Sequence, residues 1–402
     1  MTVCIKRGTA VGTVAAPPSK SMAHRMLICA GLAAGESKIS GISGGEDIAA
    51  TIDCLRALGV DITVCGDVAT VHGINLENAA PTVPLCCRES GSTLRFLVPP
   101  ALLCGRKVHF VGSETLLSRP LSVYETLCTE RGMTFAQSEN GLAVCGKLTA
   151  GEFRVPGNIS SQFISGLLFT LPLLSGDSVI RITSPVESRS YIDLTVAALA
   201  AFGVTAQWAD ERIITVAGGQ RYHAHDAAVE GDYSGAAFFE ALNVLGGRVT
   251  VTGLSADSLQ GDRVYARHFD SLKKGTPAIH LADCPDLGPV LFAVAAAKFG
   301  GVFTGTRRLK IKESDRAAAM AEELQKCGVA VTVYEDSAVV FPKELHPPTE
   351  PLCGHNDHRI VMALAVLLTE LGGEITGAEA VAKSFPDFFE RLSALGVEVV
   401  KQ

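Results

Sequence analysis

The sequence feature that most constrains the fold is a weak internal repeat, in which an amphipathic helix ends at a glycine and a β-rich segment follows. The clearest copies are Leu55–Val60, Leu199–Val204, Leu324–Val329 and Leu392–Val397. Glycine after a helix favours the left-handed conformation that closes it. The repeat glycines are Gly59, Gly132, Gly203, Gly275, Gly328 and Gly396. Most are roughly 70 residues apart, a spacing that favours small βα subdomains over solenoid repeats.

Six copies predict two domains of three units each, because one such unit is too small to bury its own helix faces. A chain of 402 residues, 47% of them hydrophobic, can fill cores of that size. The polar stretch Gly218–Asp226 is the best internal linker. We expect one first strand over Val3–Val14, followed at Pro17 and Pro18 by a second crossing between the domains.

Composition excludes several classes of function. The net charge of −7 argues against nucleic acid as the general partner. The longest apolar runs, such as Val361–Leu368, are too short to span a membrane, and no apolar leader is present at the N-terminus. The twelve cysteines form no C-x-x-C pair, so neither a zinc site nor a disulfide framework is indicated. We therefore expect a soluble cytoplasmic protein.

The stretch Pro17–Arg25 is the first candidate binding site. Its two prolines prevent an early helix start, and the apolar run that follows predicts a helix. Lys20 and Arg25 then lie at a helix N-terminus, where backbone N–H groups already favour an anion. The alternative is a solvated basic turn.

The same arrangement of a polar cluster before an apolar helix recurs in the first half of the chain. Gly91 precedes one such helix and lets a ligand approach the backbone closely. We expect Pro99 and Pro100 to break or kink that helix early. Arg119 lies just before a helix that Pro120 is expected to start.

A third cluster offers hydroxyl and amide groups instead of cations. Ser160, Ser161 and Gln162 open the apolar run that ends at Leu174, and their side chains and backbone donors suit a phosphate group. Serines in such positions are often ordinary N-caps of the following helix, which is the alternative here.

The second half of the chain adds carboxylates to the theme. Asp286 follows a proline and precedes an apolar helix, where helix capping competes with catalysis as its role. His355 and His358 could suggest a metal, but no acid or cysteine set at ligand spacing supports one. The other candidates lie at three further helix starts and are Lys312, Glu313, Arg316, Arg359 and Lys383.

Eight cations thus lie at the starts of apolar helices in an acidic protein, which predicts one pocket for several anionic groups. Asp286 and Glu313 would serve proton transfer in the same field. No P-loop or dinucleotide-binding signature accompanies these residues. The eight cations are Lys20, Arg25, Arg95, Arg119, Lys312, Arg316, Arg359 and Lys383.

Taken in order, these motifs resemble those of the 5-enolpyruvylshikimate 3-phosphate synthase family over nearly the whole chain. The matching motifs are PPSKSMAHR, SGSTLR, LSRPL, GNISSQF, SRSYID, PDLGP, IKESDR, NDHR and KSFPDFFE. The resemblance implies an α/β (α+β) fold of two similar domains, each with three βαβαββ units around a pseudo-threefold axis. We expect the first domain over residues 17–221, and a discontinuous second domain over 1–16 and 222–402.

The resemblance also implies the reaction. The family transfers the enolpyruvyl group of phosphoenolpyruvate to the 5-hydroxyl of shikimate 3-phosphate and releases phosphate, without metal or organic cofactor. Carried over, shikimate 3-phosphate would bind Ser21, Arg25, Ser160, Ser161, Gln162 and Ser188. Phosphoenolpyruvate would bind Lys20, Gly91, Arg119, Arg316, Arg359 and Lys383, with Lys312 beside them. Asp286 would take the hydroxyl proton, and Lys20 with Glu313 would deliver a proton to the methylene carbon.

Two other functions are alternatives to this one. The sister transferase that acts on UDP-N-acetylglucosamine has a Lys-Asn pair near its N-terminus and a loop cysteine. Here Lys20 is followed by Ser21, and no cysteine lies near Arg119. A non-catalytic anion-binding module would not need Asp286 and Glu313. We expect a monomeric enzyme whose partners are its two small substrates.

Overall fold

The computed structural model describes residues 1–402 and divides the chain into two compact units. We call Lys20–Val229 the continuous unit, and Met1–Ser19 together with Glu230–Gln402 the split unit. The units change after Ser19 and after Val229, whereas the prediction placed these boundaries after residues 16 and 221. Each unit has a hydrophobic core of its own.

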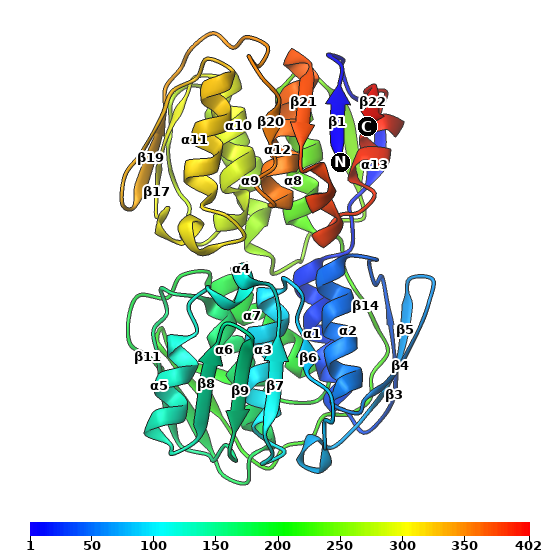
Figure 1. Cartoon of the computed structure of the whole chain (residues 1–402), viewed down its shortest axis with the longest axis vertical. Helices are drawn as coiled ribbons and strands as arrows, with labels where there is room; N and C mark the ends of the chain where they lie inside the picture. The colour runs from blue at the N-terminus through cyan, green and yellow to red at the C-terminus, as the bar shows by residue number, and fades with distance from the viewer. The chain divides into compact units, whose positions relative to one another are not determined.

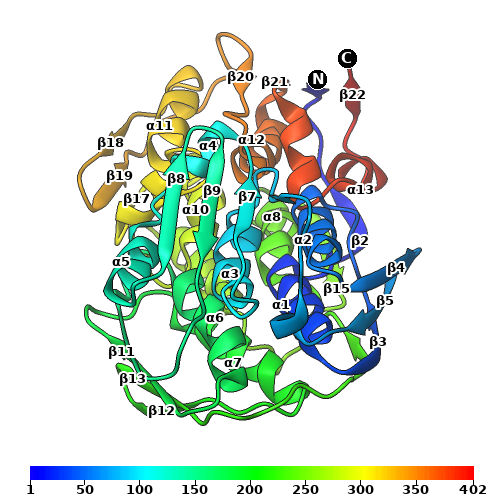
Figure 2. The same cartoon turned by 60° about the horizontal axis from the view of Figure 1, so that its bottom comes forward.

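The continuous unit contains three four-stranded sheets with the same pairing pattern. Their strand orders are β14-β3-β5-β4, β6-β7-β9-β8 and β10-β11-β13-β12, and each combines one parallel pair with an antiparallel hairpin. Figure 2 shows β7, β9 and β8 side by side in one of them. The strands are β3 (Gly35–Ser40), β4 (Asp61–Cys65), β5 (Val68–Gly73), β6 (Leu85–Cys86), β7 (Val108–Val111), β8 (Thr134–Ser138), β9 (Gly141–Cys145), β10 (Glu152–Val155), β11 (Ser178–Ile182), β12 (Gln207–Asp210), β13 (Ile213–Val216) and β14 (Ala227–Ala228).

The helices of the continuous unit fall into buried and half-buried ones. α1, α3 and α6 are buried on nearly all sides, as expected of helices that are apolar all round. The helices are α1 (Lys20–Leu32), α2 (Glu46–Ala57), α3 (Gly91–Ala101), α4 (Glu114–Leu117), α5 (Ser122–Glu130), α6 (Ser161–Thr170) and α7 (Arg189–Ala201), with 3-10 turns η1 (Leu76–Asn78) and η2 (Leu171–Leu173).

The split unit repeats the pattern in two sheets, β16-β17-β19-β18 and β20-β21-β1-β22, and adds the parallel pair β15-β2. In Figure 1, β1 from the N-terminus lies between β21 and β22 from the C-terminal region. The strands are β1 (Thr2–Ile5), β2 (Val11–Ala15), β15 (Arg248–Thr252), β16 (Ala278–His280), β17 (Gly301–Thr304), β18 (Val331–Val333), β19 (Ser337–Val340), β20 (Leu352–Cys353), β21 (Gly373–Thr376) and β22 (Val399–Lys401).

The prediction of one strand over Val3–Val14 is wrong. The segment forms two strands, β1 and β2, because they belong to different sheets and the chain must pass from one sheet to the other. Between them, the Gly8 amide donates to the carbonyl oxygen of Thr369 at 2.9 Å instead of to a strand neighbour.

Three central helices of the split unit, α8, α10 and α12, pack against one another. They are buried on nearly every side, again in keeping with sequences that are apolar all round. The helices are α8 (Tyr233–Val244), α9 (Tyr265–Leu272), α10 (Gly288–Ala297), α11 (Arg316–Lys326), α12 (His358–Leu371) and α13 (Phe388–Ala394), with 3-10 turns η3 (Gly261–Val264), η4 (Pro285–Leu287), η5 (Arg307–Ile311) and η6 (Ala378–Lys383).

The repeat glycines behave as predicted at five of six positions. Gly59, Gly132, Gly203, Gly328 and Gly396 have φ between 66° and 105°, the left-handed conformation of a helix C-cap. The prediction is wrong for Gly275, which is not among the residues with positive φ. The preceding helix, α9, ends at Leu272, so Gly275 lies too far beyond its last turn to close it.

We expected Pro99 and Pro100 to break or kink their helix early, and the break is wrong, because α3 continues through both prolines to Ala101. Proline at position 99 removes the N–H that would bond to the carbonyl oxygen of Arg95. The Tyr124 hydroxyl donates to that oxygen instead, at 2.7 Å. A side chain from α5 therefore satisfies the carbonyl that the proline leaves without its helical partner.

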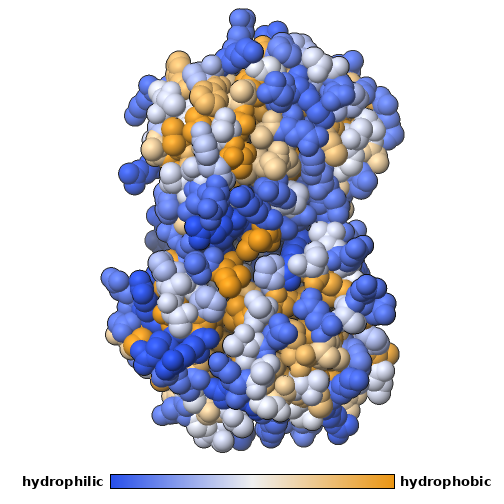
Figure 3. Space-filling view, turned by 60° about the vertical axis from the view of Figure 1, so that its left-hand side comes forward, coloured by the Kyte–Doolittle hydropathy of each residue, from blue (hydrophilic) through white to orange (hydrophobic).

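The surface is mixed in polarity. On the face drawn in Figure 3, hydrophobic residues are interspersed among more numerous hydrophilic ones. Large hydrophobic side chains that are more than half exposed include Val83, Leu259 and Tyr334. No helix combines the length and apolar character that crossing a membrane would require.

Candidate active site

Most of the predicted site residues lie at or beside the first turn of a helix, because each of these segments changes there from polar to apolar sequence. In the continuous unit these helices are α1, α3, α6 and α7, and in the split unit α10, α11 and α12. Since the N-terminal turns carry unpaired backbone N–H groups, such positions favour anions. The two units are described in turn.

Lys20 is the first residue of α1, and its ammonium lies 2.9 Å from the Asp47 carboxylate in the first turn of α2. The Lys20 side chain is 15% exposed and that of Asp47 10%. An ion pair shielded to this degree fixes the direction in which the ammonium points. The structure therefore gives Lys20 a defined position at the surface of the unit.

Arg25, one turn further along α1, is held by α7. Its guanidinium donates to the carbonyl oxygens of Ser21 and Tyr191 at 2.6 and 2.8 Å and to the Thr195 hydroxyl at 2.9 Å. The ring of Phe96 lies 5.0 Å from it. Burial lowers the pKa of Arg25 to about 10, so the side chain stays charged at neutral pH. Arg25 is thus a rigid cation that links α1 to the helix that follows Ser188.

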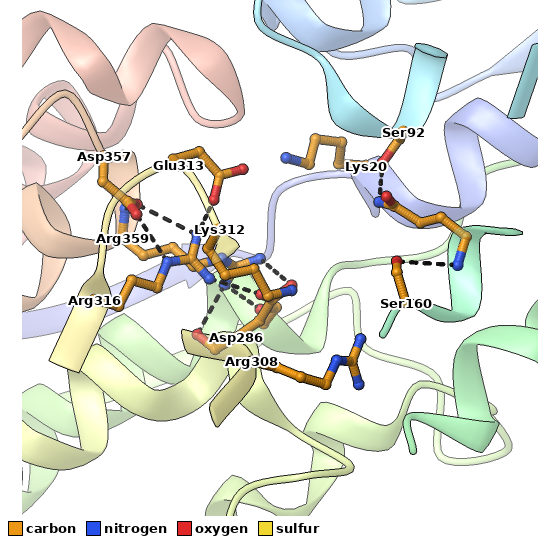
Figure 4. Close-up of polar contacts among 12 residues, drawn as sticks. Lys20, Ser92, Ser160, Asp286, Arg308, Lys312, Glu313, Arg316, Asp357 and Arg359 are labelled. Carbon is orange, nitrogen blue, oxygen red and sulfur yellow. Dashed lines mark hydrogen bonds and ion pairs between the residues drawn. The ribbon is translucent and has the colours of Figure 1, made fainter. Parts of the chain in front are cut away.

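Gly91, the first residue of α3, lies among three polar side chains. A Cβ atom on Gly91 would lie 3.0 Å from Nη1 of Arg119, 3.4 Å from Nη1 of Arg95 and 3.9 Å from Oε1 of Gln162. Arg95 donates to that Gln162 oxygen at 2.8 Å. The side-chain amide of Gln162 donates to the Ser92 hydroxyl at 2.9 Å (Figure 4). The sequence prediction that these separate segments meet is correct for Gly91, Arg119 and Gln162.

The serine positions differ from one another. Ser160 is the N-cap of α6, and its hydroxyl accepts a hydrogen bond from the backbone N–H of Gln162 at 3.3 Å, so its capping role is confirmed. Ser161, the first residue of the helix, is buried. Ser188 precedes α7 in the left-handed conformation with φ 56°, which is uncommon for a residue with a side chain. The substrate role of all three stays a prediction.

In the split unit, Asp286 gathers three cations. Its carboxylate lies 2.8 Å from Arg316, 3.1 Å from Arg359 and 3.2 Å from Lys312 (Figure 4). Helix capping was the alternative role for this residue, but the N-cap of α10 is Leu287 and no side chain caps it. The capping alternative is therefore wrong, and Asp286 acts as the anion around which the cations are arranged.

Arg316 is the most buried of these cations, with a side chain that is 1% exposed. It contacts Glu313 at 2.6 Å and Asp357 at 2.8 Å in addition to Asp286 (Figure 4). Burial opposes its charge, yet the Asp357, Glu313 and Asp286 carboxylates together raise the pKa of Arg316 above its ordinary value. The carboxylates of Asp286, Glu313 and Asp357 thus form a network of ion pairs around the Arg316 guanidinium.

The remaining cations are attached to this network. Burial lowers the pKa of Lys312 to about 8, with the charges of Arg308 and Arg316 adding to the effect and Asp286 opposing it. Arg359 donates to the Ser234 hydroxyl and, at 3.2 Å, to the carbonyl oxygen of Asp286. A lysine with this pKa can exchange a proton near neutral pH.

Lys383, at the end of η6, donates to the carbonyl oxygen of Asn356, one residue before the N-cap of α12. The structure therefore brings together all the predicted site residues of the split unit. They are Asp286, Lys312, Glu313, Arg316, Arg359 and Lys383.

Sequence reasoning missed three residues that orient the site. Asp47 pairs with Lys20, Thr195 accepts from Arg25, and Asp357 pairs with Arg316 while capping α12. A signal was available for Asp47 and Asp357, since an acidic residue before or within the first turn of a helix is a typical N-terminal feature. Thr195 lies inside α7 and carries no such signal.

These arrangements can bind anions and move protons. In each unit, buried or half-buried cations are fixed by protein carboxylates or carbonyl oxygens, so they are already oriented when an anionic ligand arrives. Asp286 and Glu313 can accept or donate a proton within such a field.

Comparison with known proteins points to one family. A sequence model of EPSP synthase (3-phosphoshikimate 1-carboxyvinyltransferase) matches residues 6–392. A 3-phosphoshikimate 1-carboxyvinyltransferase of Clostridium kluyveri is 40% identical over 411 residues, which cover 96% of each chain. The protein of that name from Clostridium perfringens is 41% identical over 408 residues, again 96% of each chain.

Solved structures support the fold independently. An EPSP synthase structure from Acinetobacter baumannii matches with a TM-score of 0.78 over the full length of both chains. A second structure from the same organism matches with a TM-score of 0.79. The sequence identities of 23% and 22% make this a similarity of fold.

Proposed function

The chain belongs to the EPSP synthase (3-phosphoshikimate 1-carboxyvinyltransferase) family, and from this premise we propose that it joins phosphoenolpyruvate to the 5-hydroxyl of shikimate 3-phosphate. The products are 5-enolpyruvylshikimate 3-phosphate and phosphate. The similarity to the clostridial relatives extends over nearly the whole chain and therefore includes both units.

The observation that carries the proposal is the network of buried ion pairs around Arg316 in the split unit. Arg316 and Asp357 are almost completely buried, and Asp286 and Glu313 are each 16% exposed. A fold gains little stability from burying so many charges, since their desolvation offsets most of the attraction between them. Such a network is better explained by a ligand that carries several negative charges and needs proton transfer.

Each substrate is assigned to residues by the resemblance of this chain's motifs to those of the family. Shikimate 3-phosphate would take Arg25 and the hydroxyl and amide groups of Ser21, Ser160, Ser161, Gln162 and Ser188. Phosphoenolpyruvate would take the cationic side chains and the Gly91 backbone, with the cations being Lys20, Arg119, Lys312, Arg316, Arg359 and Lys383.

The proposed chemistry is an addition followed by an elimination. The 5-hydroxyl oxygen bonds to C2 of phosphoenolpyruvate while Asp286 takes its proton, and C3 receives a proton from Lys20 or Glu313. The resulting intermediate then loses phosphate from C2 and a proton from C3, which restores the double bond. The ion pair between Lys20 and Asp47 supports the role of Lys20 as a proton donor, because it holds the ammonium in one direction.

We expect phosphate release from phosphoenolpyruvate to require shikimate 3-phosphate and to persist in a metal chelator. The physical reason is that protein cations can supply the positive charge that an anionic transition state needs. A coupled phosphate assay with and without each substrate measures this. Turnover that the chelator abolishes and a divalent metal restores would contradict the expectation. Binding without phosphate release would favour the anion-binding module, and turnover with UDP-N-acetylglucosamine the sister transferase.

We expect Gly91→Ala to weaken the family inhibitor glyphosate more than phosphoenolpyruvate. The added methyl group would lie 3.0 Å from Nη1 of Arg119, so the guanidinium must move. Overpacking of this kind costs enough to weaken binding about tenfold, and the longer ligand has less room to adjust. The inhibition constant and the KM are compared with those of Gly275→Ala, where an added Cβ would meet no atom within 4 Å and the glycine does not have a positive φ. Equal weakening of both ligands by Gly91→Ala would mean that Gly91 serves only the turn.

A further inference from the structure

The turn between β20 and α12 carries two groups that orient the candidate site. The carbonyl oxygen of Asn356 accepts a hydrogen bond from Lys383, and Asp357 pairs with Arg316. Asp357 also accepts from the Arg359 amide at 2.9 Å as the N-cap of α12. Three cations assigned to phosphoenolpyruvate therefore depend on the position of this turn.

The backbone of the turn is in an uncommon conformation. His355 and Asn356 are both left-handed, with φ 48° and 51°. Residues with side chains adopt this conformation at a cost, and they keep it only where surrounding contacts impose it. Something outside the turn must therefore hold it in place.

Glu323 of α11 provides those contacts. Its side chain is fully buried, and one carboxylate oxygen lies 2.8 Å from Nε2 of His355. The other oxygen accepts from the Cys353 amide at 2.8 Å and lies 3.0 Å from the Lys326 ammonium. Glu323 thus joins α11, whose first residue is Arg316, to the side chain of the turn's first left-handed residue and to the backbone two residues before it.

We propose that Glu323 is a positioning residue, which acts through His355 and the Cys353 amide to hold the turn that orients Lys383, Arg316 and Arg359. The assignment of these cations to phosphoenolpyruvate rests on the proposed function. Glu323 itself is not assigned to either substrate, so its effect on binding is indirect.

A metal site explains the same residues less well. One ligand atom from each of Glu322, Glu323 and His355 lies within 4.8 Å of the others. The Lys326 ammonium already occupies an oxygen of Glu323, and the Cys353 amide shares that oxygen. A cation beside a lysine ammonium would be repelled, so an ion pair fits this cluster better than a metal.

The contact between His355 and Glu323 also makes the turn sensitive to pH. The hydrogen bond to Glu323 raises the pKa of His355 above its usual 6.5, while burial opposes the shift. The charged groups that face it are Glu322, Glu323 and Lys326 of α11, and Glu350 lies 3.6 Å from Lys326. Because the pKa is raised, the charged contact is complete below pH 6.5 and is lost as the pH rises through the pKa of the folded protein.

The main test is Glu323→Gln, which keeps the shape of the side chain and an acceptor for the Cys353 amide but removes the charge. We expect the KM for phosphoenolpyruvate to rise about tenfold, the effect of losing one charge-assisted hydrogen bond. We expect kcat and the KM for shikimate 3-phosphate to change less than about twofold, since the cations that the turn orients are assigned to phosphoenolpyruvate. The control is Glu350→Gln, which removes an exposed carboxylate near Lys326 and should leave both KM values unchanged.

A second variant gives a readout that a merely structural residue would not move. For the wild type we expect the KM for phosphoenolpyruvate to rise above pH 6.5 relative to that of His355→Gln, in which the titrating group is absent. A constant ratio of the two KM values across that range would overturn the proposal. A Glu323→Gln variant with the wild-type KM for phosphoenolpyruvate would also overturn it. So would a variant in which kcat falls and both KM values rise together with a loss of thermal stability.

Hydrogen exchange separates this proposal from the proposed function. Glu323→Gln should speed exchange at the amides of residues 353–357, whereas Glu350→Gln should not, whether or not the protein turns over these substrates. A wild-type protein without transferase activity would overturn the proposed function alone. Unchanged exchange in Glu323→Gln would overturn the positioning role alone.

Discussion

Lys20→Met should reduce kcat by about a hundredfold or more, because the substitution keeps the length of the side chain but removes its charge and its donor protons. In the proposed mechanism Lys20 serves with Glu313 in delivering a proton to the methylene carbon of phosphoenolpyruvate, and its pairing with Asp47 at 2.9 Å fixes the direction of its ammonium. Steady-state kinetics with both substrates measure the change in kcat and in each KM.

The control is Lys38→Met in β3 of the same unit. The Lys38 side chain is 57% exposed and lies 3.8 Å from Glu36, so its removal should leave turnover near that of the wild type. Because Lys20→Met leaves the Asp47 carboxylate without its partner, thermal unfolding of both variants should be recorded beside the kinetics. Near-normal turnover in Lys20→Met would remove this lysine from the mechanism.

Arg316→Met should lower the free energy of unfolding by about 3–5 kcal/mol at pH 7, the usual cost of breaking a buried ion pair from one side. The guanidinium is 1% exposed and contacts three carboxylates, of which that of Asp357 is completely buried. Without Arg316, the Asp357 carboxylate would be a buried charge without its ion-pair partner. The loss of stability should therefore shrink as the pH falls and the carboxylates take up protons.

Urea denaturation at pH 7 and at pH 5 tests this directly. Lys273→Met is the control, since it removes the cation of an exposed ion pair with Asp270 in the same unit and should cost about 1 kcal/mol or less. Adding Asp357→Asn to Arg316→Met should restore part of the lost stability, because the unpaired charge is then absent. If Arg316→Met unfolds at the wild-type urea concentration at pH 7, the network does not contribute to folding as described.

The sequence predicted the positions of the site residues better than their partners. Helix starts could be recognised at Lys20, Gly91 and Arg316 because polar residues change there to apolar runs, a local pattern. The partners Asp47 and Thr195 are far from Lys20 and Arg25 along the chain and meet them only through packing of α1 against α2 and α7. No local pattern reports such a contact.

The failures of local rules have the same origin. Proline at position 99 is unfavourable in a helix interior when judged from the sequence alone. In the fold, the Tyr124 hydroxyl from another helix compensates for the missing N–H, and α3 continues. Likewise, Val3–Val14 reads as one strand because both halves are β-rich, whereas the change of sheet after Ile5 is a property of the topology.

The place of β1 has a consequence for the order in which a newly made chain can fold. β1 is synthesised first, yet its partners β21 and β22 are among the last segments to leave the ribosome. The continuous unit is complete once β14 has paired with β3, so it can fold while the rest of the chain is still being made. The split unit must keep its first strand without its partners throughout that time, and it can close only after synthesis has ended.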